Sequence, residues 1–83
     1  MIACRILAYL YACMKEGEKP DEEQISPERL GINQRYWAFI TLSLHNKGLI
    51  NLEQPEITMD GIEYMEENPA ISLAINLDNM YQP

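Results

Sequence analysis

The most informative part of the sequence for the fold is Ile57-Thr58-Met59-Asp60-Gly61-Ile62-Glu63-Tyr64-Met65. Thr58 is a good residue to cap a helix, because its side-chain oxygen can accept a hydrogen bond from a backbone N–H of the first turn. Gly61 has no Cβ and therefore permits close backbone packing at that turn. The pattern predicts a helix that begins after Thr58 and ends at Asn68-Pro69.

A small β-hairpin is predicted directly before this helix. Its first run extends from Leu49 to Leu52 after Gly48, and its second run extends from Ile57 to Met59. The turn between them is Glu53-Gln54-Pro55-Glu56, where the missing N–H of Pro55 does no harm.

Three helices are predicted before the hairpin. The first runs from about Ile2 to Glu16, with apolar residues at helical spacing, and Gly17 ends it. A short second helix begins with Ser26-Pro27, a cap followed by a proline at the first helical position. The third follows the capping residue Asn33 and runs from Gln34 to about Lys47. The tight turn between the second and third helices indicates a helix-turn-helix.

The whole order resembles a winged-helix domain, and two stretches carry the resemblance. Asn46-Lys47-Gly48-Leu49-Ile50 looks like the end of a third helix entering the first wing strand. Residues 57–65 resemble the hydrophobic-Thr-x-x-Gly signature that follows the wing. With Ile6-Leu7-Ala8-Tyr9-Leu10, they are similar to the YjcQ-like family of small bacterial and prophage-associated winged-helix proteins. The resemblance implies one winged-helix domain over residues 1–83, mainly α with a small β-hairpin, and it implies no reaction.

The charge balance limits the partners. The chain has 13 acidic and 6 basic residues among 83, a formal net charge of -7. Such a field repels phosphate backbones and anionic lipid surfaces, so bulk charge excludes a nonspecific nucleic-acid binder. The short wing also departs from the family in having no basic residue between Ile50 and Thr58. DNA remains a disfavoured partner, and no membrane partner is expected.

The two cysteines favour a reducing cytoplasm. Cys4 and Cys13 lie on one predicted helix, roughly 13 Å apart along its axis, which is too far for a disulfide. The apolar start of the chain is about as long as the shortest signal-peptide core, and nothing downstream looks like a secreted disulfide framework. We therefore expect a cytoplasmic protein.

No enzyme is expected from the sequence. His45 is the only histidine, and Ser43, two positions away on the same helix, points to a different face. The carboxylate runs Asp21-Glu22-Glu23 and Glu66-Glu67 read as solvated surface rather than acid-base pairs. The four glycines form no phosphate-binding loop. We predict no catalytic residue, no cofactor site and no metal site.

The third predicted helix is the informative one, because it is the usual recognition helix of a winged-helix protein. At about 100° per residue, one face holds Trp37, Ile40, Leu44 and part of Tyr36, and we expect this face to meet the core. The opposite face holds Arg35, Phe39, Leu42 and Asn46.

Three interpretations of that opposite face stay open. Phe39 and Leu42 can pack on the last helix, form a protein interface, or lie within a DNA-reading surface. The candidate DNA contacts are Arg29, Gln34, Arg35, Asn46 and Lys47.

The last predicted helix, from about Ala70 to Tyr81, is apolar around most of its circumference. It can pack between the first and third helices, or it can form a symmetric dimer. Tyr11 and Tyr81 would anchor that dimer, because both are large, stiff and amphipathic. The predicted interface residues are Phe39, Leu42, Tyr11, Leu77, Met80 and Tyr81.

The sequence thus predicts a non-catalytic winged-helix interaction module of the prophage-associated type, which works as a homodimer or with a protein partner. The alternative is a sequence-specific DNA-binding transcriptional regulator.

Overall fold

The computed structural model describes residues 2–68. This part of the chain is mainly helical with one small antiparallel sheet, as predicted for a winged helix. The elements in order are α1 (Ile2–Glu16), the 3-10 helix η1 (Glu22–Ile25), α2 (Pro27–Leu30), α3 (Gln34–Asn46), β1 (Ile50–Asn51), β2 (Glu56–Ile57) and α4 (Met59–Glu67).

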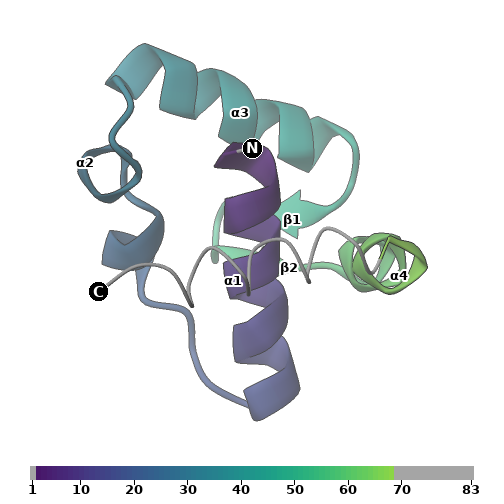
Figure 1. Ribbon diagram of the computed structural model, residues 1–83. Coiled ribbons are helices and arrows are strands. Elements are labelled where there is room, and N and C mark those ends of the chain that lie inside the picture. Colours follow the sequence, from purple (N-terminus) through teal and green to yellow (C-terminus); the bar gives the residue numbers. More distant parts are fainter. Residues whose placement is uncertain (1, 69–83) are drawn as a thin grey trace.

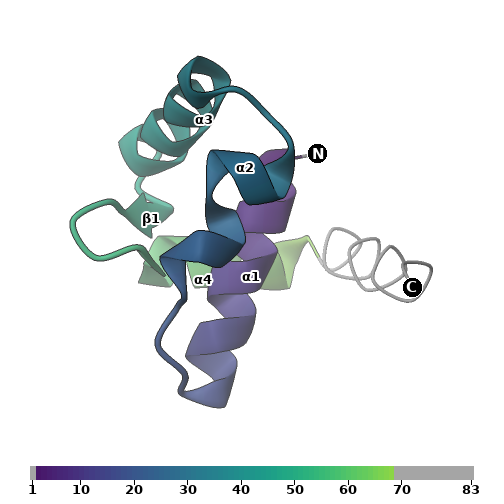
Figure 2. The same cartoon turned by 90° about the vertical axis from the view of Figure 1, so that its left-hand side faces the viewer.

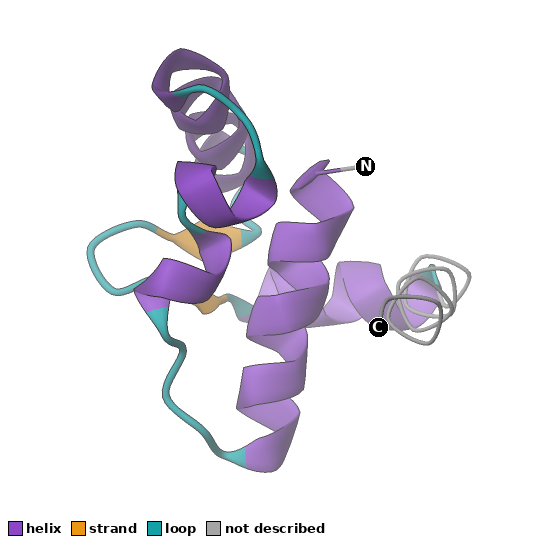
Figure 3. Ribbon diagram, turned by 60° about the vertical axis from the view of Figure 1, so that its left-hand side comes forward, coloured by secondary structure: helices purple, strands orange, loops and turns teal. Residues whose placement is uncertain are grey.

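Helix α1 is the centre of the fold. It contacts α3, α4 and β2, with η1 and α2 on one side and α4 on the other (Figure 1). Helix α3 crosses near the N-terminal end of α1, and the hairpin lies below α3 (Figures 1 and 3). The shared core is formed by Ile6, Leu7, Leu10, Ile25, Leu30, Ile40, Leu44, Ile50, Ile57 and Met65.

Three side chains cap the helices that surround α1. The Ser26 hydroxyl accepts a hydrogen bond from Arg29 N–H at 3.2 Å, and Asn33 Oδ1 accepts one from Tyr36 N–H at 2.8 Å. At the start of α4, Thr58 Oγ1 accepts from Gly61 N–H at 3.0 Å. Each cap satisfies a donor that the helix itself cannot pair, so all three predicted caps are confirmed.

The junction between hairpin and α4 is tightly packed. A Cβ at Gly61 would collide with the Leu49 carbonyl oxygen and with the Ile57 side chain. The prediction that Gly61 permits close backbone packing is therefore confirmed.

The hairpin is shorter than predicted. Only Ile50 with Ile57 and Asn51 with Glu56 are paired. Thr58 N–H still donates to Leu49 O at 3.0 Å, but Thr58 is also the cap of α4, so the chain leaves the strand there. Helix α3 also ends at Asn46, one residue before the predicted end.

One element was not predicted from the sequence. The acidic run that we expected only to cross the surface leads into η1, where the Asp21 side chain accepts a hydrogen bond from Glu23 N–H. The short helix is anchored because Ile25 at its end is buried in the core.

The predicted last helix, residues 70–81, lies outside the described residues. Within residues 2–68, no helix has the length and apolar character needed to cross a lipid bilayer.

Candidate protein-interaction surface

Helix α3 is held in place by the turn that precedes it. Gly31 ends α2 with a φ of 72°, in the left-handed region that glycine adopts without steric cost. Asn33 then caps α3, so only three residues separate the two helices. This is the predicted helix-turn-helix connection, and it fixes which side of α3 faces the core.

The inner side of α3 is formed by Ile40, Thr41 and Leu44, which are all buried. Thr41 can be buried because its hydroxyl donates to the Trp37 carbonyl oxygen at 3.0 Å, within the helix itself. Trp37 is half-buried, and its indole N–H donates to Ile25 O at 2.7 Å. The predicted core positions Trp37, Ile40 and Leu44 are confirmed in this arrangement.

The outer face of α3 carries three large exposed side chains. Phe39 is 68% exposed, Leu42 is 51% exposed and Tyr36 is 49% exposed. The assignment of part of Tyr36 to the core side was wrong, because the Asn33 cap and the burial of Thr41 turn position 36 outward. We use "outer face of α3" for Arg35, Tyr36, Phe39, Leu42 and Asn46.

Sequence reasoning missed Tyr36 as a member of this face. Tyr36 and Phe39 are three residues apart, which makes them neighbours on a helix surface. That spacing was the available signal, whereas winding the helix at about 100° per residue placed part of Tyr36 on the face of Trp37, Ile40 and Leu44.

The candidate DNA contacts are all exposed, but they do not form one continuous patch on α3. Gln34 and Arg35 lie in its first turn, whereas Asn46 and Lys47 lie at its other end. Between these two ends of α3, the exposed side chains of Phe39 and Leu42 are apolar. Arg29 lies at the end of α2.

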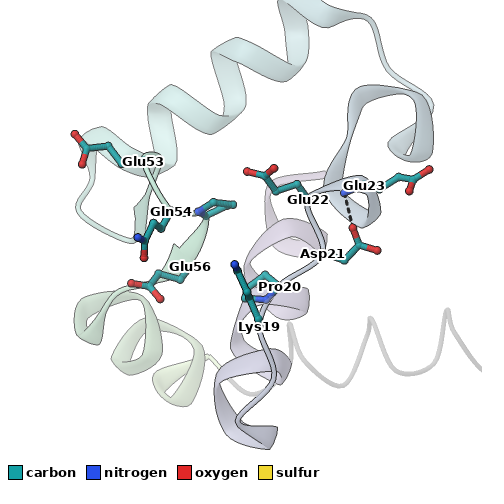
Figure 4. Close-up of a pocket in the computed structure, with 9 residues that line it drawn as sticks. Lys19, Pro20, Asp21, Glu22, Glu23, Glu53, Gln54 and Glu56 are labelled. Carbon is teal, nitrogen blue, oxygen red and sulfur yellow. Dashed lines mark hydrogen bonds between the residues drawn. The ribbon is translucent and has the colours of Figure 1, made fainter.

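The surface beside the hairpin is strongly acidic. A groove of about 530 Å³ lies between the segment before η1 and the loop of the hairpin. Figure 4 shows Lys19 between the two acidic sides. The acidic residues that line the groove are Asp21, Glu22, Glu23, Glu53 and Glu56. A winged-helix protein that binds DNA through its wing needs the opposite charge at this place.

Tyr9 holds the acidic segment against α1. Its phenol oxygen accepts a hydrogen bond from Asp21 N–H at 2.9 Å. Burial raises the pKa of Tyr9 above its ordinary value of 10.0, and the hydrogen bond from Asp21 opposes that shift without cancelling it.

A second hollow lies on the inner side of α3. It has a volume of about 320 Å³ and a mainly apolar floor from Ile6, Leu10, Ile25, Trp37 and Ile50. Its floor residues other than Trp37 belong to the core, whereas Glu22, Gln34 and Leu52, which also line the hollow, are exposed.

Of the four remaining predicted interface residues, only Tyr11 lies within the part of the chain that the structure describes. Tyr11 is half-buried against the core, and the Lys15 ammonium lies 5.4 Å from the centre of its ring. Leu77, Met80 and Tyr81 lie outside the described residues. The role of these four side chains in an interface stays a prediction.

The groups that could carry chemistry are dispersed. His45 Nδ1 lies 3.2 Å from Ile50 O, so the ring is bound to the start of the hairpin. Cys4 and Cys13 are free. Among the residues that the structure describes, no group of three or more histidine, cysteine or acidic side chains is arranged to hold a metal ion.

Comparison with known proteins identifies the family. No curated protein matches the chain, and no solved structure matches it. The YjcQ family, described as YjcQ protein, matches residues 4–51, which extend from the first turn of α1 through α3 to β1. This match includes the helix-turn-helix and the outer face of α3, and it covers more than half of the chain. The chain therefore belongs to the YjcQ family.

Proposed function

We propose that this protein is a non-catalytic interaction module that binds protein through the outer face of α3, and that a second copy of the chain is a partner. The observation that carries the proposal is the exposure of Tyr36, Phe39 and Leu42 on that face. A cluster of large apolar side chains on an outer face is typical of an interface.

The charge distribution supports a protein partner. Helix α3 contains no acidic residue, although the chain has 13 of them. Helix α3 itself therefore repels neither a protein nor DNA, whereas the acidic groove beside the hairpin repels an anionic ligand that would contact the wing as well as α3.

The proposal includes a cytoplasmic location and no enzymatic activity. Free thiols at Cys4 and Cys13 fit a reducing compartment. His45 is bound to the hairpin backbone, which leaves it poorly placed as a general base for a distant nucleophile. The prophage association that the family resemblance implies stays a prediction.

Sedimentation velocity of the full chain over a range of concentrations tests the proposal. We expect the wild type to self-associate and the double variant Phe39→Ser/Leu42→Ser to sediment as a monomer. Met59→Ser is the matched control, because Met59 on α4 is also 68% exposed. Equal association of the wild type and the double variant would contradict the proposal.

The second candidate function is sequence-specific DNA binding. It is favoured by the exposure of Gln34 and Arg35 at the first turn of α3, with Lys47 exposed at its other end. Fluorescence anisotropy with duplex DNA at about 50 mM and 200 mM salt tests it, because phosphate contacts weaken steeply with salt. Salt-sensitive binding that Arg35→Ala reduces and Phe39→Ser leaves unchanged would favour DNA over the protein interface.

A further inference from the structure

The outer face of α3 is too small to hold a dimer by pairing with itself. Burying a whole aromatic side chain removes about 150–250 Å² from water. Tyr36, Phe39 and Leu42 are already partly covered, so they supply well under the roughly 800 Å² per partner that a standard interface buries. An occupant with a larger apolar surface of its own is needed.

The chain contains such a segment in residues 70–81. The sequence predicts a helix there, and Leu73, Leu77 and Met80 recur at i, i+4 and i+7, which places them on one stripe. Twelve helical residues extend for about 18 Å, a length similar to that of the thirteen-residue helix α3.

The charges of the two segments are complementary. Arg35 is the only acidic or basic residue of α3 apart from His45, and Asp78 is the only charged side chain in residues 69–83. In an antiparallel pair with Leu77 opposite Phe39, Asp78 lies toward the half of α3 that carries Arg35. Antiparallel packing also brings the opposite ends of the two helix dipoles together.

The position of α4 favours exchange between two copies. Helix α4 starts beside Leu49, because Gly61 packs on the Leu49 carbonyl, and it packs on α1 and β2. Figure 2 shows α4 passing behind α1, with its end on the side of the molecule away from the last turn of α3. Residues 68 and 69 connect α4 to the predicted helix, so Glu67 and Ala70 are joined by three Cα–Cα steps, which span at most about 11 Å. That reach is no longer than the roughly 10–12 Å diameter of a helix, and the segment would have to pass α3 itself to reach its outer face from the core side.

We propose that two copies of this chain exchange their C-terminal segments, with residues 70–81 of each copy packed on the outer face of α3 of the other. This inference rests on the proposed function, because it names the occupant of the same surface. The arrangement is a closed two-fold dimer. It contains two equivalent contacts, each of which buries one α3 face and one apolar segment.

Complementation between two full-length variants tests the exchange. Phe39→Asp damages the α3 face, and Leu77→Asp damages the segment. In a homodimer of either variant, each of the two contacts contains one damaged surface. An equimolar mixture can form a heterodimer with one intact contact, between the α3 face of one variant and the segment of the other.

Light scattering coupled to size exclusion provides the readout. We expect a wild-type dimer, a monomer for each variant alone, and a dimer peak that returns in the mixture. Circular dichroism checks that both variants are folded. Phe39→Cys/Leu77→Cys gives a second readout, because oxidation should yield a covalent dimer on a denaturing gel, beyond what either single cysteine variant gives.

The outcomes separate this inference from the proposed function. A Leu77→Asp protein that stays dimeric, while Phe39→Asp becomes monomeric, would overturn the exchange and leave the α3 interface in place. A covalent monomer from the double cysteine variant would show that the segment packs on its own chain, which also overturns the exchange. If Phe39→Asp leaves the dimer intact, both the exchange and the α3 interface are wrong.

Discussion

Helix α3 presents Ile40 and Leu44 to the interior and Phe39 and Leu42 to the exterior. Both sides are apolar, and residues only one or two positions apart on one helix, such as Phe39 and Ile40, have opposite environments. The inner side packs on α1 and on β1 of the hairpin, and Ile40 and Leu44 belong to the shared core. On the outer side, Phe39 stays 68% exposed. An apolar side chain on this helix therefore contributes to the core on one side and stays exposed to solvent on the other.

The largest effect on the free energy of unfolding should come from truncating a buried side chain on the inner side of α3. Leu44→Ala should lower the free energy of unfolding by about 2–5 kcal/mol, because it removes buried methyl groups and leaves a cavity. Chemical denaturation monitored by circular dichroism measures the change. Leu42→Ala on the outer side is the control. A loss of less than about 1 kcal/mol for Leu44→Ala would mean that the inner side is not the tightly packed one.

Adding one carbon at the junction between hairpin and α4 should have the next largest effect. Gly61→Ala places a Cβ against Leu49 O and the Ile57 side chain. Overpacking of this kind costs about 1–3 kcal/mol. The melting temperature should therefore fall well below that of Met59→Ala, the control in the exposed first turn of the same helix. If Gly61→Ala were as stable as the control, the close approach of α4 to the hairpin would be wrong.

Most of the described fold could be predicted because its boundaries depend on local chemistry. Ser26, Asn33 and Thr58 cap their helices with their own side chains, and such caps can be recognised in a sequence without knowledge of tertiary contacts. Helix η1 has a cap of the same kind at Asp21, but Ile25 is its single buried residue, and one apolar position gives no helical periodicity that would predict the element.

The candidate surface was predicted less completely for a related reason. Phe39 and Leu42 were correctly placed opposite Ile40 and Leu44, since helical periodicity fixes relative directions. The exact rotation of the helix toward the core depends on α1 and on the turn before α3, and this rotation exposed Tyr36 and buried Thr41. The contacts of α3 with α1 and with the preceding turn cannot be predicted from the sequence of α3 alone.

A moderate effect is expected where the acidic segment is bound to α1. Tyr9→Phe removes the hydroxyl that accepts the Asp21 N–H and should cost about 0.5–1.5 kcal/mol at neutral pH. Since folding raises the pKa of Tyr9 above 10.0, the folded state favours the neutral phenol. The stabilisation from that preference is complete below pH 10 and is lost as the pH rises through the folded pKa.

The pH dependence can be measured by urea denaturation between pH 8 and pH 11. The decline of wild-type stability above pH 10 should be shallower in Tyr9→Phe. Tyr36→Phe is the control, because Tyr36 is exposed on α3, and it should keep the wild-type slope. Identical slopes for the wild type and Tyr9→Phe would show that Tyr9 does not contribute to the alkaline loss of stability.

The smallest effect on stability should come from the outer face. Phe39→Ala should change the free energy of unfolding by no more than about 0.5 kcal/mol, because a 68% exposed side chain has little packing to lose. The measurement must be made at a concentration where the wild type is monomeric, since association stabilises a folded chain by mass action. Under those conditions the inner and outer sides of α3 are compared within a single chain. A cost above about 1 kcal/mol in the dilute monomer would mean that Phe39 is packed within its own chain. That result would remove the contrast between the two sides of α3. It would also mean that residues 70–81 pack on α3 of their own chain rather than on a second copy.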